Sequence, residues 1–185
     1  GNAQESGGPS NSIWSHFSNL MNPVNVGQWE IQHYTISSME SGLGTLIHEM
    51  LHQMGAYDLY DVHSDLPSST WNGLGDWDIM ASGNWNGNSM SPAMPGAATL
   101  ITVGGLGMIE IETSSTQDIQ LYPMSSKNNN TRVAYIETAP EEAVLVTYRA
   151  DIGFDSELPG SGIIVEYLDK NNGNVDENTC LLYTS

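Results

Sequence analysis

Two histidines and a glutamate stand at the spacing that a catalytic zinc site requires. His48, Glu49 and His52 form the pattern H-E-x-x-H. Side chains four positions apart project from the same face of a helix, so both imidazoles can bind one zinc ion. Glu49 would point near the metal without coordinating it, where it can take a proton from a zinc-bound water. The pattern therefore predicts metal-assisted hydrolysis.

A catalytic zinc needs three protein ligands and one open position, and the chain after the pattern offers the third ligand. Gly55 follows His52 by three residues, and Asp58 follows Gly55 by three. A glycine turn can reverse the chain, so that the carboxylate of Asp58 closes the coordination sphere from the other side. The metzincin pattern has histidine at this place, and a carboxylate also suits zinc. We predict His48, His52 and Asp58 as metal ligands and Glu49 as the catalytic base.

Asp61 and His63 follow in the same loop and are the other candidates for the third ligand, but Asp58 is favoured. Asp61 is a candidate to hydrogen-bond a ligand histidine and orient it. For His63, a solvated position in the loop is favoured over metal binding. His63 as a fourth protein ligand would instead close the site and make it structural. His16 and His33 lie outside the pattern, and ordinary packing is favoured for both.

A methionine farther along the chain is the second feature with a chemical meaning. Met80 stands in the segment GDWDIMASG of residues 75–83, 22 residues after Asp58. In metzincin-type sites a methionine turn passes beneath the metal and forms an apolar floor. The chain has nine methionines, so ordinary packing is the alternative, and the Trp-Asp-Ile-Met-Ala setting favours the turn. Asp78 in the same segment is, with Asp61, a candidate to support the ligands.

A helix and a turn are needed to position these side chains. The strongest helix prediction covers residues 41–54, where apolar residues at helical spacing occupy one side and the histidines another. Gly55 is placed to end this helix in a left-handed turn. Residues 28–36 alternate as a strand does. Residues 61–96 show little periodicity and are predicted to be irregular and rich in loops.

From about residue 108 the chain becomes rich in β-branched and aromatic residues separated by turn-formers. Short strands are predicted at 109–112, 119–122, 132–138, 143–148 and 162–168. The fold class expected is α+β, with an active-site helix and Met-turn in residues 1–107 and a β-rich antiparallel segment or flanking domain in residues 108–179. The abrupt change after residue 179 favours a non-native tail at residues 180–185.

The charge balance is strongly acidic, with 22 Asp and Glu against four Lys and Arg. Such a surface repels nucleic acids and anionic membranes, so neither is expected as a partner. No apolar run is long enough to cross a bilayer. The single cysteine, Cys180, excludes an internal disulfide and a multi-cysteine zinc site. The first twelve residues lack the features of a signal peptide, and we expect the chain to be an internal piece of a longer protein.

The chain resembles the M6 peptidases, the immune inhibitor A-like metalloproteases. Three segments carry the resemblance: HEMLHQMGAYDLYD at 48–61, GDWDIMASGNWNG at 75–87 and VTYRADIGFDSELPGSGIIVEYLD at 146–169. The stretch Ile13-Trp14-Ser15-His16 is also similar to a Trp-x-His stretch ahead of the family's active site, so the resemblance covers most of residues 13–170. Leu51 and Tyr57 depart from it, where the family usually has glycine and often has proline; altered packing is expected there.

The resemblance implies a metzincin-like zinc protease region with zinc at His48, His52 and Asp58, with Glu49 catalytic and Met80 in the Met-turn. It also implies a secreted endopeptidase that acts on protein or peptide substrates, is made with a prosegment and often has calcium sites.

For the acidic residues 169–177, a solvated turn is favoured over a calcium loop, because the EF-hand spacing is absent. The alternative function is a secreted β-rich binding or adhesive module in which the zinc site is structural.

Overall fold

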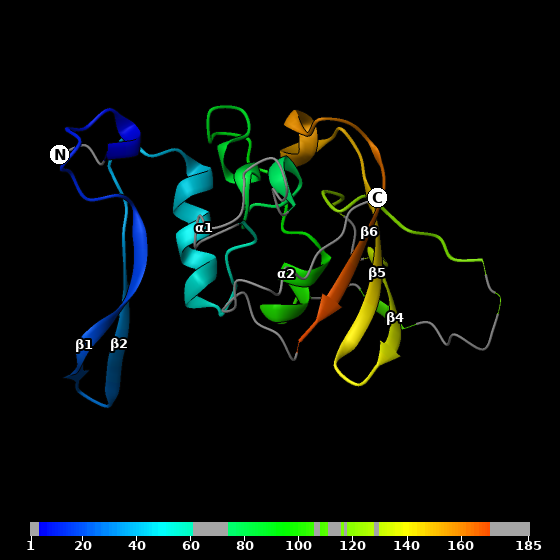
Figure 1. Ribbon diagram of the computed structural model, residues 1–185, viewed down its shortest axis with the longest axis horizontal. Coiled ribbons are helices and arrows are strands. Elements are labelled where there is room, and N and C mark those ends of the chain that lie inside the picture. The colour runs from blue at the N-terminus through cyan, green and yellow to red at the C-terminus, as the bar shows by residue number, and fades with distance from the viewer. Residues whose placement is uncertain are drawn as a thin grey trace.

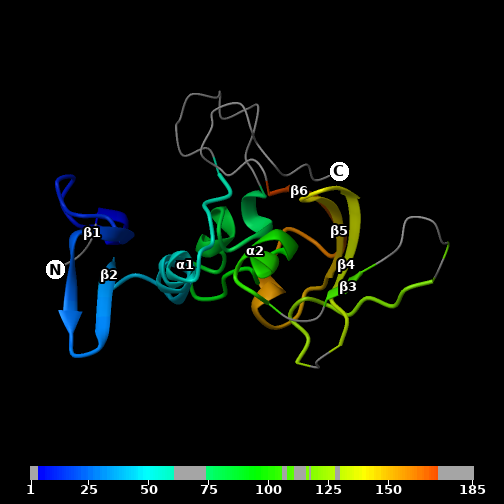
Figure 2. The ribbon, with the colours of Figure 1, turned by 90° about the horizontal axis from the view of Figure 1, so that it is seen from below.

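The computed structural model describes residues 4–60, 74–105, 108–110, 116, 118–127 and 130–170. It contains helices and two sheets, so the predicted α+β composition is confirmed. A β-hairpin lies at one end of the molecule, helix α1 follows it, and α2 lies between α1 and the larger sheet in both views (Figures 1 and 2). This order places α1, which carries His48 and His52, between the hairpin and the rest of the molecule.

The hairpin consists of β1 (His16–Val26) and β2 (Trp29–Ile36), which pair antiparallel. The prediction of a strand at 28–36 is confirmed within one residue. β1 was not predicted, because its apolar residues do not alternate with polar ones and Pro23 interrupts them. The hairpin packs against α1, and the ring of Phe17 lies 5.8 Å from that of His52 between centroids. The short turn η1 (Gln4–Ser6) precedes it.

Helix α1 (Leu43–Gln53) confirms the predicted helix within two residues at its start and one at its end. Gly55 adopts φ +97° and its N–H donates to the carbonyl of His52 at 3.0 Å, so the helix ends in the expected glycine turn. The apolar side of the helix is largely exposed, however, with Met50 and Met54 53% and 58% exposed. The side that carries the histidines is the one packed into the molecule.

The larger sheet has the order β3-β4-β5-β6. Its strands are β3 (Met108–Glu110), β4 (Val133–Ala139), β5 (Glu142–Arg149) and β6 (Gly162–Asp169). β4, β5 and β6 pair antiparallel, which confirms the prediction for these strands, whereas β3 pairs parallel with β4 and is the exception. The predicted strand at 119–122 is wrong. Residues 119–122 form no strand, and only Pro123 forms an isolated bridge, with Tyr148.

The segment between α1 and this sheet is irregular, as predicted, over its described residues 74–96. It contains the short turns η2 (Gly75–Trp77) and η3 (Ser82–Trp85), and η4 (Gly153–Glu157) lies before β6. Helix α2 (Ala97–Thr102) was not predicted, because six residues after a Pro-Gly pair carry too little periodicity.

One hydrophobic core joins the two predicted parts of the chain. Its buried members are Leu74, Ala81, Ala97, Ala98, Met124, Val133, Ala143, Leu145 and Leu168. They come from both sides of residue 107, so the sheet packs directly on the segment that follows the metal-ligand helix. The predicted tail at 180–185 lies outside the described residues.

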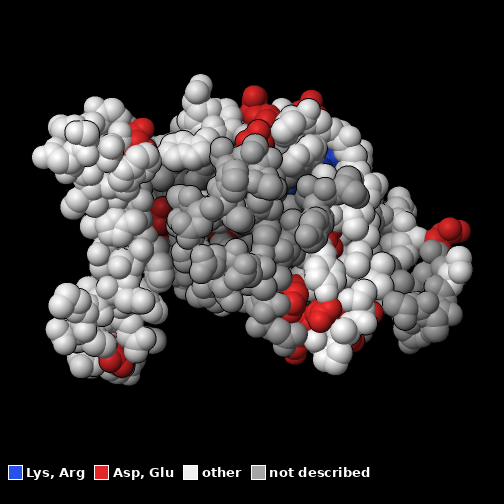
Figure 3. All heavy atoms as spheres, viewed as in Figure 1, with Lys and Arg blue, Asp and Glu red and all other residues white. Residues whose placement is uncertain are grey.

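The charged groups on the face drawn in Figure 3 are mostly acidic, and they are scattered over it. Of the four basic residues, Arg149 is 1% exposed and therefore contributes almost nothing to the surface. Among the described residues, no helix has the length and apolar character needed to cross a membrane.

Candidate metal centre

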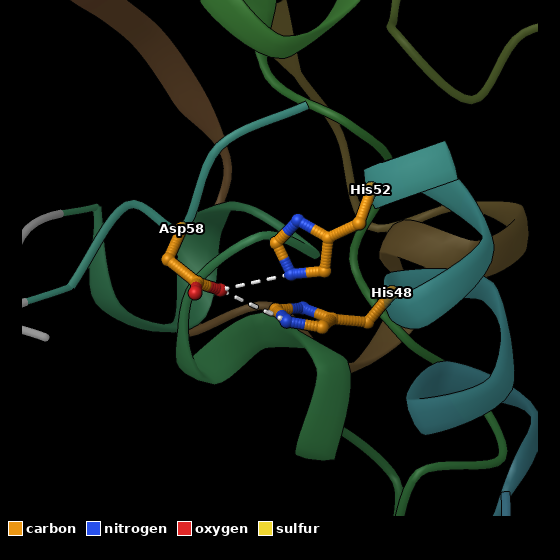
Figure 4. A group of neighbouring side chains, drawn as sticks. All are labelled: His48, His52 and Asp58. Atoms are coloured by element: carbon orange, nitrogen blue, oxygen red, sulfur yellow. Dashed lines mark ion pairs between the residues drawn. The ribbon is translucent and has the colours of Figure 1, made fainter. Parts of the chain in front are cut away.

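The three predicted ligands point toward one another (Figure 4). His48 and His52 project from α1, and Asp58 projects from the loop that follows it. The Nε2 atoms of His48 and His52 lie 3.1 and 3.2 Å from Oδ1 of Asp58. Two donors that are each about 2.1 Å from a tetrahedral zinc lie about 3.4 Å apart. The donor spacing therefore fits one shared metal ion, and the described part of the chain holds no other such His, Cys, Asp and Glu cluster.

Backbone carbonyls fix the orientation of both imidazoles. Nδ1 of His48 lies 2.7 Å from the carbonyl oxygen of Ile79, and Nδ1 of His52 lies 2.8 Å from that of Ala56. A carbonyl oxygen only accepts hydrogen bonds, so each Nδ1 carries a proton and donates it. In a neutral ring Nε2 is then the unprotonated nitrogen, and its lone pair can bind a metal placed between it and Asp58. Without a metal, a protonated Nε2 can donate to Asp58 instead.

The segment predicted as the Met-turn contacts both elements that carry ligands. Met80 is fully buried, and its carbonyl accepts the N–H of Leu59 at 2.8 Å, next to Asp58. The preceding residue, Ile79, holds His48. The turn therefore touches the surroundings of two of the three ligands.

Leu51, where the chain departs from the family resemblance, packs in the interior. Leu51 is buried in a small cluster with Ala56, Ile79 and Met80. Its side chain thus fills space between the helix and the turn, away from the ligand nitrogens.

Asp78 supports the turn, and it makes no direct bond to a histidine of the described residues. Its Oδ1 accepts the N–H of Met80 at 2.7 Å, and its Oδ2 accepts the N–H of Gly96 at 2.7 Å and the hydroxyl of Thr99 at 3.0 Å. It is fully buried, and burial raises the pKa of its carboxyl despite these hydrogen bonds. The other candidate for this role, Asp61, lies outside the described residues, as does His63.

Glu49 is 8% exposed and lines a cavity of about 360 Å³ together with His48. Trp14, Tyr60 and Trp85 also line it. Tyr60 and Trp85 were not predicted as site residues. Their place in the segments 48–61 and 75–87, which carry the family resemblance, was the only feature of the sequence that pointed to them. Glu49 thus has a hollow beside it in which a substrate can lie.

His16 and His33 belong to the hairpin and lie outside the ligand cluster. Nδ1 of His16 bonds the carbonyl of Trp14 at 2.8 Å, and its Nε2 lies 3.3 Å from the hydroxyl of Tyr34. The ring of His33 packs 5.4 Å from that of Phe17 between centroids. The residues beyond position 170 that were weighed as a calcium loop are outside the described part of the chain.

The ligand cluster keeps the carboxylate of Asp58 ionised. Burial acts to raise its pKa, but hydrogen bonds and charge from His48 and His52 outweigh burial and hold the pKa well below its usual range. For His52, burial acts to lower the pKa, yet the hydrogen bond to Asp58 and the Ala56 carbonyl raise it overall. An anionic Asp58 is the form that binds a divalent cation.

A second buried carboxyl group should make folding stability depend on pH. Glu166 on β6 is 1% exposed, and burial, followed by the charge of Asp78, raises its pKa from 4.5 to about 7. The folded chain then holds a proton that the unfolded chain releases. The part of the stability that is linked to Glu166 is therefore full below about pH 4.5 and is lost as the pH rises to about 7. We expect the thermal midpoint, measured with chelator present, to decline less steeply over this window in Glu166→Gln.

Glu30→Gln, which changes an exposed glutamate on β2, is the control for the general effect of removing one negative charge. Parallel declines in the wild type and Glu166→Gln would contradict the assignment of this titration to Glu166.

Comparison with known families gives one match. The family described as immune inhibitor A peptidase M6, catalytic domain, matches residues 1–99. This range is more than half of the 185 residues and includes all of the predicted ligands, Glu49 and Met80. No curated protein matches the chain.

Proposed function

Because the chain belongs to the immune inhibitor A peptidase M6 family, we propose that it is a zinc-dependent endopeptidase in which His48, His52 and Asp58 hold the metal. The observation that carries this proposal is the meeting of two Nε2 atoms and one carboxylate oxygen at separations of 3.1 and 3.2 Å. Membership of a metallopeptidase family supports hydrolase activity on proteins or peptides.

The donor set suits a catalytic metal. Two neutral imidazoles and one carboxylate match a three-ligand zinc site, and the cavity beside them leaves room for substrate and water. Zinc bound there would polarise the scissile carbonyl and lower the pKa of the attacking water. The buried Met80 would form the floor of the site, as in a metzincin-type Met-turn.

Glu49 would do the proton transfer. It directly follows a ligand histidine and lines the same cavity as His48, so it can reach a water beside the metal position. As the water attacks the peptide carbonyl, Glu49 accepts its proton and then passes that proton to the departing amine. Export from the cell is also part of the proposal and rests on the family resemblance alone.

Zinc binding and its removal test the proposal on the whole chain. We expect about one zinc per chain by elemental analysis, because one site is built from three donors. Digestion of casein should stop when a chelator removes the zinc and return when zinc is added back. A chain that cleaves casein equally well after its metal content has been shown to be zero would contradict the proposal. So would a wild-type chain that binds no zinc.

A further inference from the structure

Buried ionisable side chains of the larger sheet form hydrogen bonds with the segment that contacts the metal centre. We propose that Arg149 on β5 and Glu166 on β6 are positioning residues for the zinc ligands, because they hold the segment 77–98 that orients His48 and the loop of Asp58. This inference rests on the proposed function and adds to it a role for the sheet. We name Arg149, Asp155, Glu166, Asp78 and Thr99 together the clamp.

The end of the clamp next to the metal centre is the turn at Asp78. The residues after it bond His48 through Ile79 and the Asp58 loop through Leu59. Asp78 itself accepts the N–H of Met80, so the shape of the turn depends on this carboxylate. A shift of the turn would move the Ile79 carbonyl and turn the imidazole of His48.

Asp78 connects this turn to helix α2. Its Oδ2 accepts the N–H of Gly96 and the hydroxyl of Thr99, at 2.7 and 3.0 Å. A Cβ at Gly96 would stand 2.5 Å from this same oxygen, so the backbone and the carboxylate touch with no room for a side chain. Asp78 therefore ties the start of α2 directly to the turn.

Glu166 holds the start of α2 from the sheet side, where Figure 2 shows α2 lying beside the strands. Its two carboxylate oxygens accept the N–H groups of Ala97 and Ala98, both at 3.1 Å. A Cβ at Gly96 would also stand 3.2 Å from Oε1 of Glu166. The carboxyl groups of Asp78 and Glu166 thus approach the same point of the backbone from two elements.

Arg149 forms hydrogen bonds with the same segment at two other residues. Its guanidinium donates to the carbonyls of Trp77 and Met94, at 2.9 and 3.2 Å. Its charge is balanced by Asp155, with Nη2 to Oδ1 at 2.7 Å and Nε to Oδ2 at 3.1 Å. Asp155 also accepts the N–H of Met94 at 2.9 Å. Trp77 is the residue immediately before Asp78, so Arg149 fixes the entry to the turn.

Burial makes these contacts costly to lose. Arg149 and Glu166 are each 1% exposed and Asp155 and Asp78 are fully buried, so water cannot replace a lost partner. Partners that orient metal-ligating histidines typically change metal affinity by about 10- to 100-fold when they are removed. The clamp acts on His48 through one further backbone contact, so we place its effect at the lower end of that range.

A matched pair of threonine substitutions tests the clamp. Thr99→Val removes one hydrogen bond to Asp78, whereas Thr147→Val removes a hydroxyl on β5 that makes no hydrogen bond in the described part of the chain. The two residues are 3% and 0% exposed, and valine has the shape of threonine. We expect Thr99→Val to raise the zinc Kd about 10-fold. It should also shift the visible spectrum of the cobalt-substituted chain, because the ligand geometry changes. Thr147→Val should change neither.

Two variants with larger expected effects on zinc binding complete the test. Arg149→Lys keeps a positive charge near Asp155 but loses the planar fork that reaches Trp77 and Met94. Glu166→Gln keeps the size of the side chain but replaces one of its two oxygens by an amide NH2, which cannot accept the N–H of Ala97 or Ala98. Folded variants of both should bind zinc at least as weakly as Thr99→Val.

If Thr99→Val binds zinc as the wild type does and leaves the cobalt spectrum unchanged, the inference is overturned, even if the apo variant melts earlier. A wild type that binds no zinc would overturn this inference together with the proposed function, whereas unchanged variants of a zinc-binding wild type would overturn the inference alone.

Discussion

Glu49→Gln is expected to lower casein hydrolysis by about 100- to 10,000-fold and to leave zinc bound. Glutamine has the size of glutamate but cannot accept the proton of the attacking water. Glu49 is not among the donors that meet at the metal position, so its replacement removes no ligand. The measurement is the initial rate of casein digestion at saturating zinc, together with the zinc content of the purified variant.

Glu30→Gln gives the matched control, since it makes the same chemical change at an exposed position on β2. Its activity should equal that of the wild type. A Glu49→Gln chain that retains zinc and the full rate would exclude Glu49 as the base. A variant that loses zinc together with activity would instead show that Glu49 supports the metal.

Asp58→Asn is expected to weaken zinc binding by about 100-fold or more, a larger loss than removal of an orienting partner produces. The amide keeps the shape of the carboxylate but carries no charge to balance zinc. It also replaces the anionic oxygen that both imidazoles face at 3.1 and 3.2 Å by a neutral amide oxygen, which binds zinc less well. The zinc Kd, measured by competition with a chromogenic chelator, checks this expectation.

Asp76→Asn makes the same substitution at an exposed aspartate close to the Met-turn. It should leave the zinc Kd within about twofold of the wild type, because solvent screens an exposed charge outside the ligand cluster. Equal zinc affinities for Asp58→Asn and Asp76→Asn would remove Asp58 from the ligand set and return Asp61 and His63 as candidates for the third ligand.

The candidate site was predictable because its residues lie close together in the sequence. Helical geometry alone brings residues 48 and 52 to one face, and the glycine turn at position 55 needs only a positive φ, which the structure shows as +97°. The interval from His48 to Asp58 is short, so few arrangements of the chain are available. The same holds for the strand at 28–36 and for β4, β5 and β6, whose alternation is visible within each segment.

Burial could not be predicted from local pattern. The periodicity of α1 marks an apolar side, yet Met50 and Met54 on that side are more than half exposed. His48 and Glu49 are buried instead, because the turn at 78–81 packs on the polar side of the helix. The parallel pairing of β3 with β4 was missed for a similar reason, since a strand's own sequence does not specify the direction of its partner.

The sequence by itself determined the chemistry of this protein: which side chains can bind a metal, which can transfer a proton, and that they lie within one turn-terminated helix and its loop. Only the tertiary structure decided what holds them. The contacts of His48 with the Ile79 carbonyl, of Asp78 with Gly96, and of Glu166 with the start of α2 join residues 31, 18 and 69 positions apart. Every residue except proline carries the same backbone N–H and carbonyl groups. The pattern of side chains therefore does not show which of these groups will form the contacts. They are brought together only when the whole core folds.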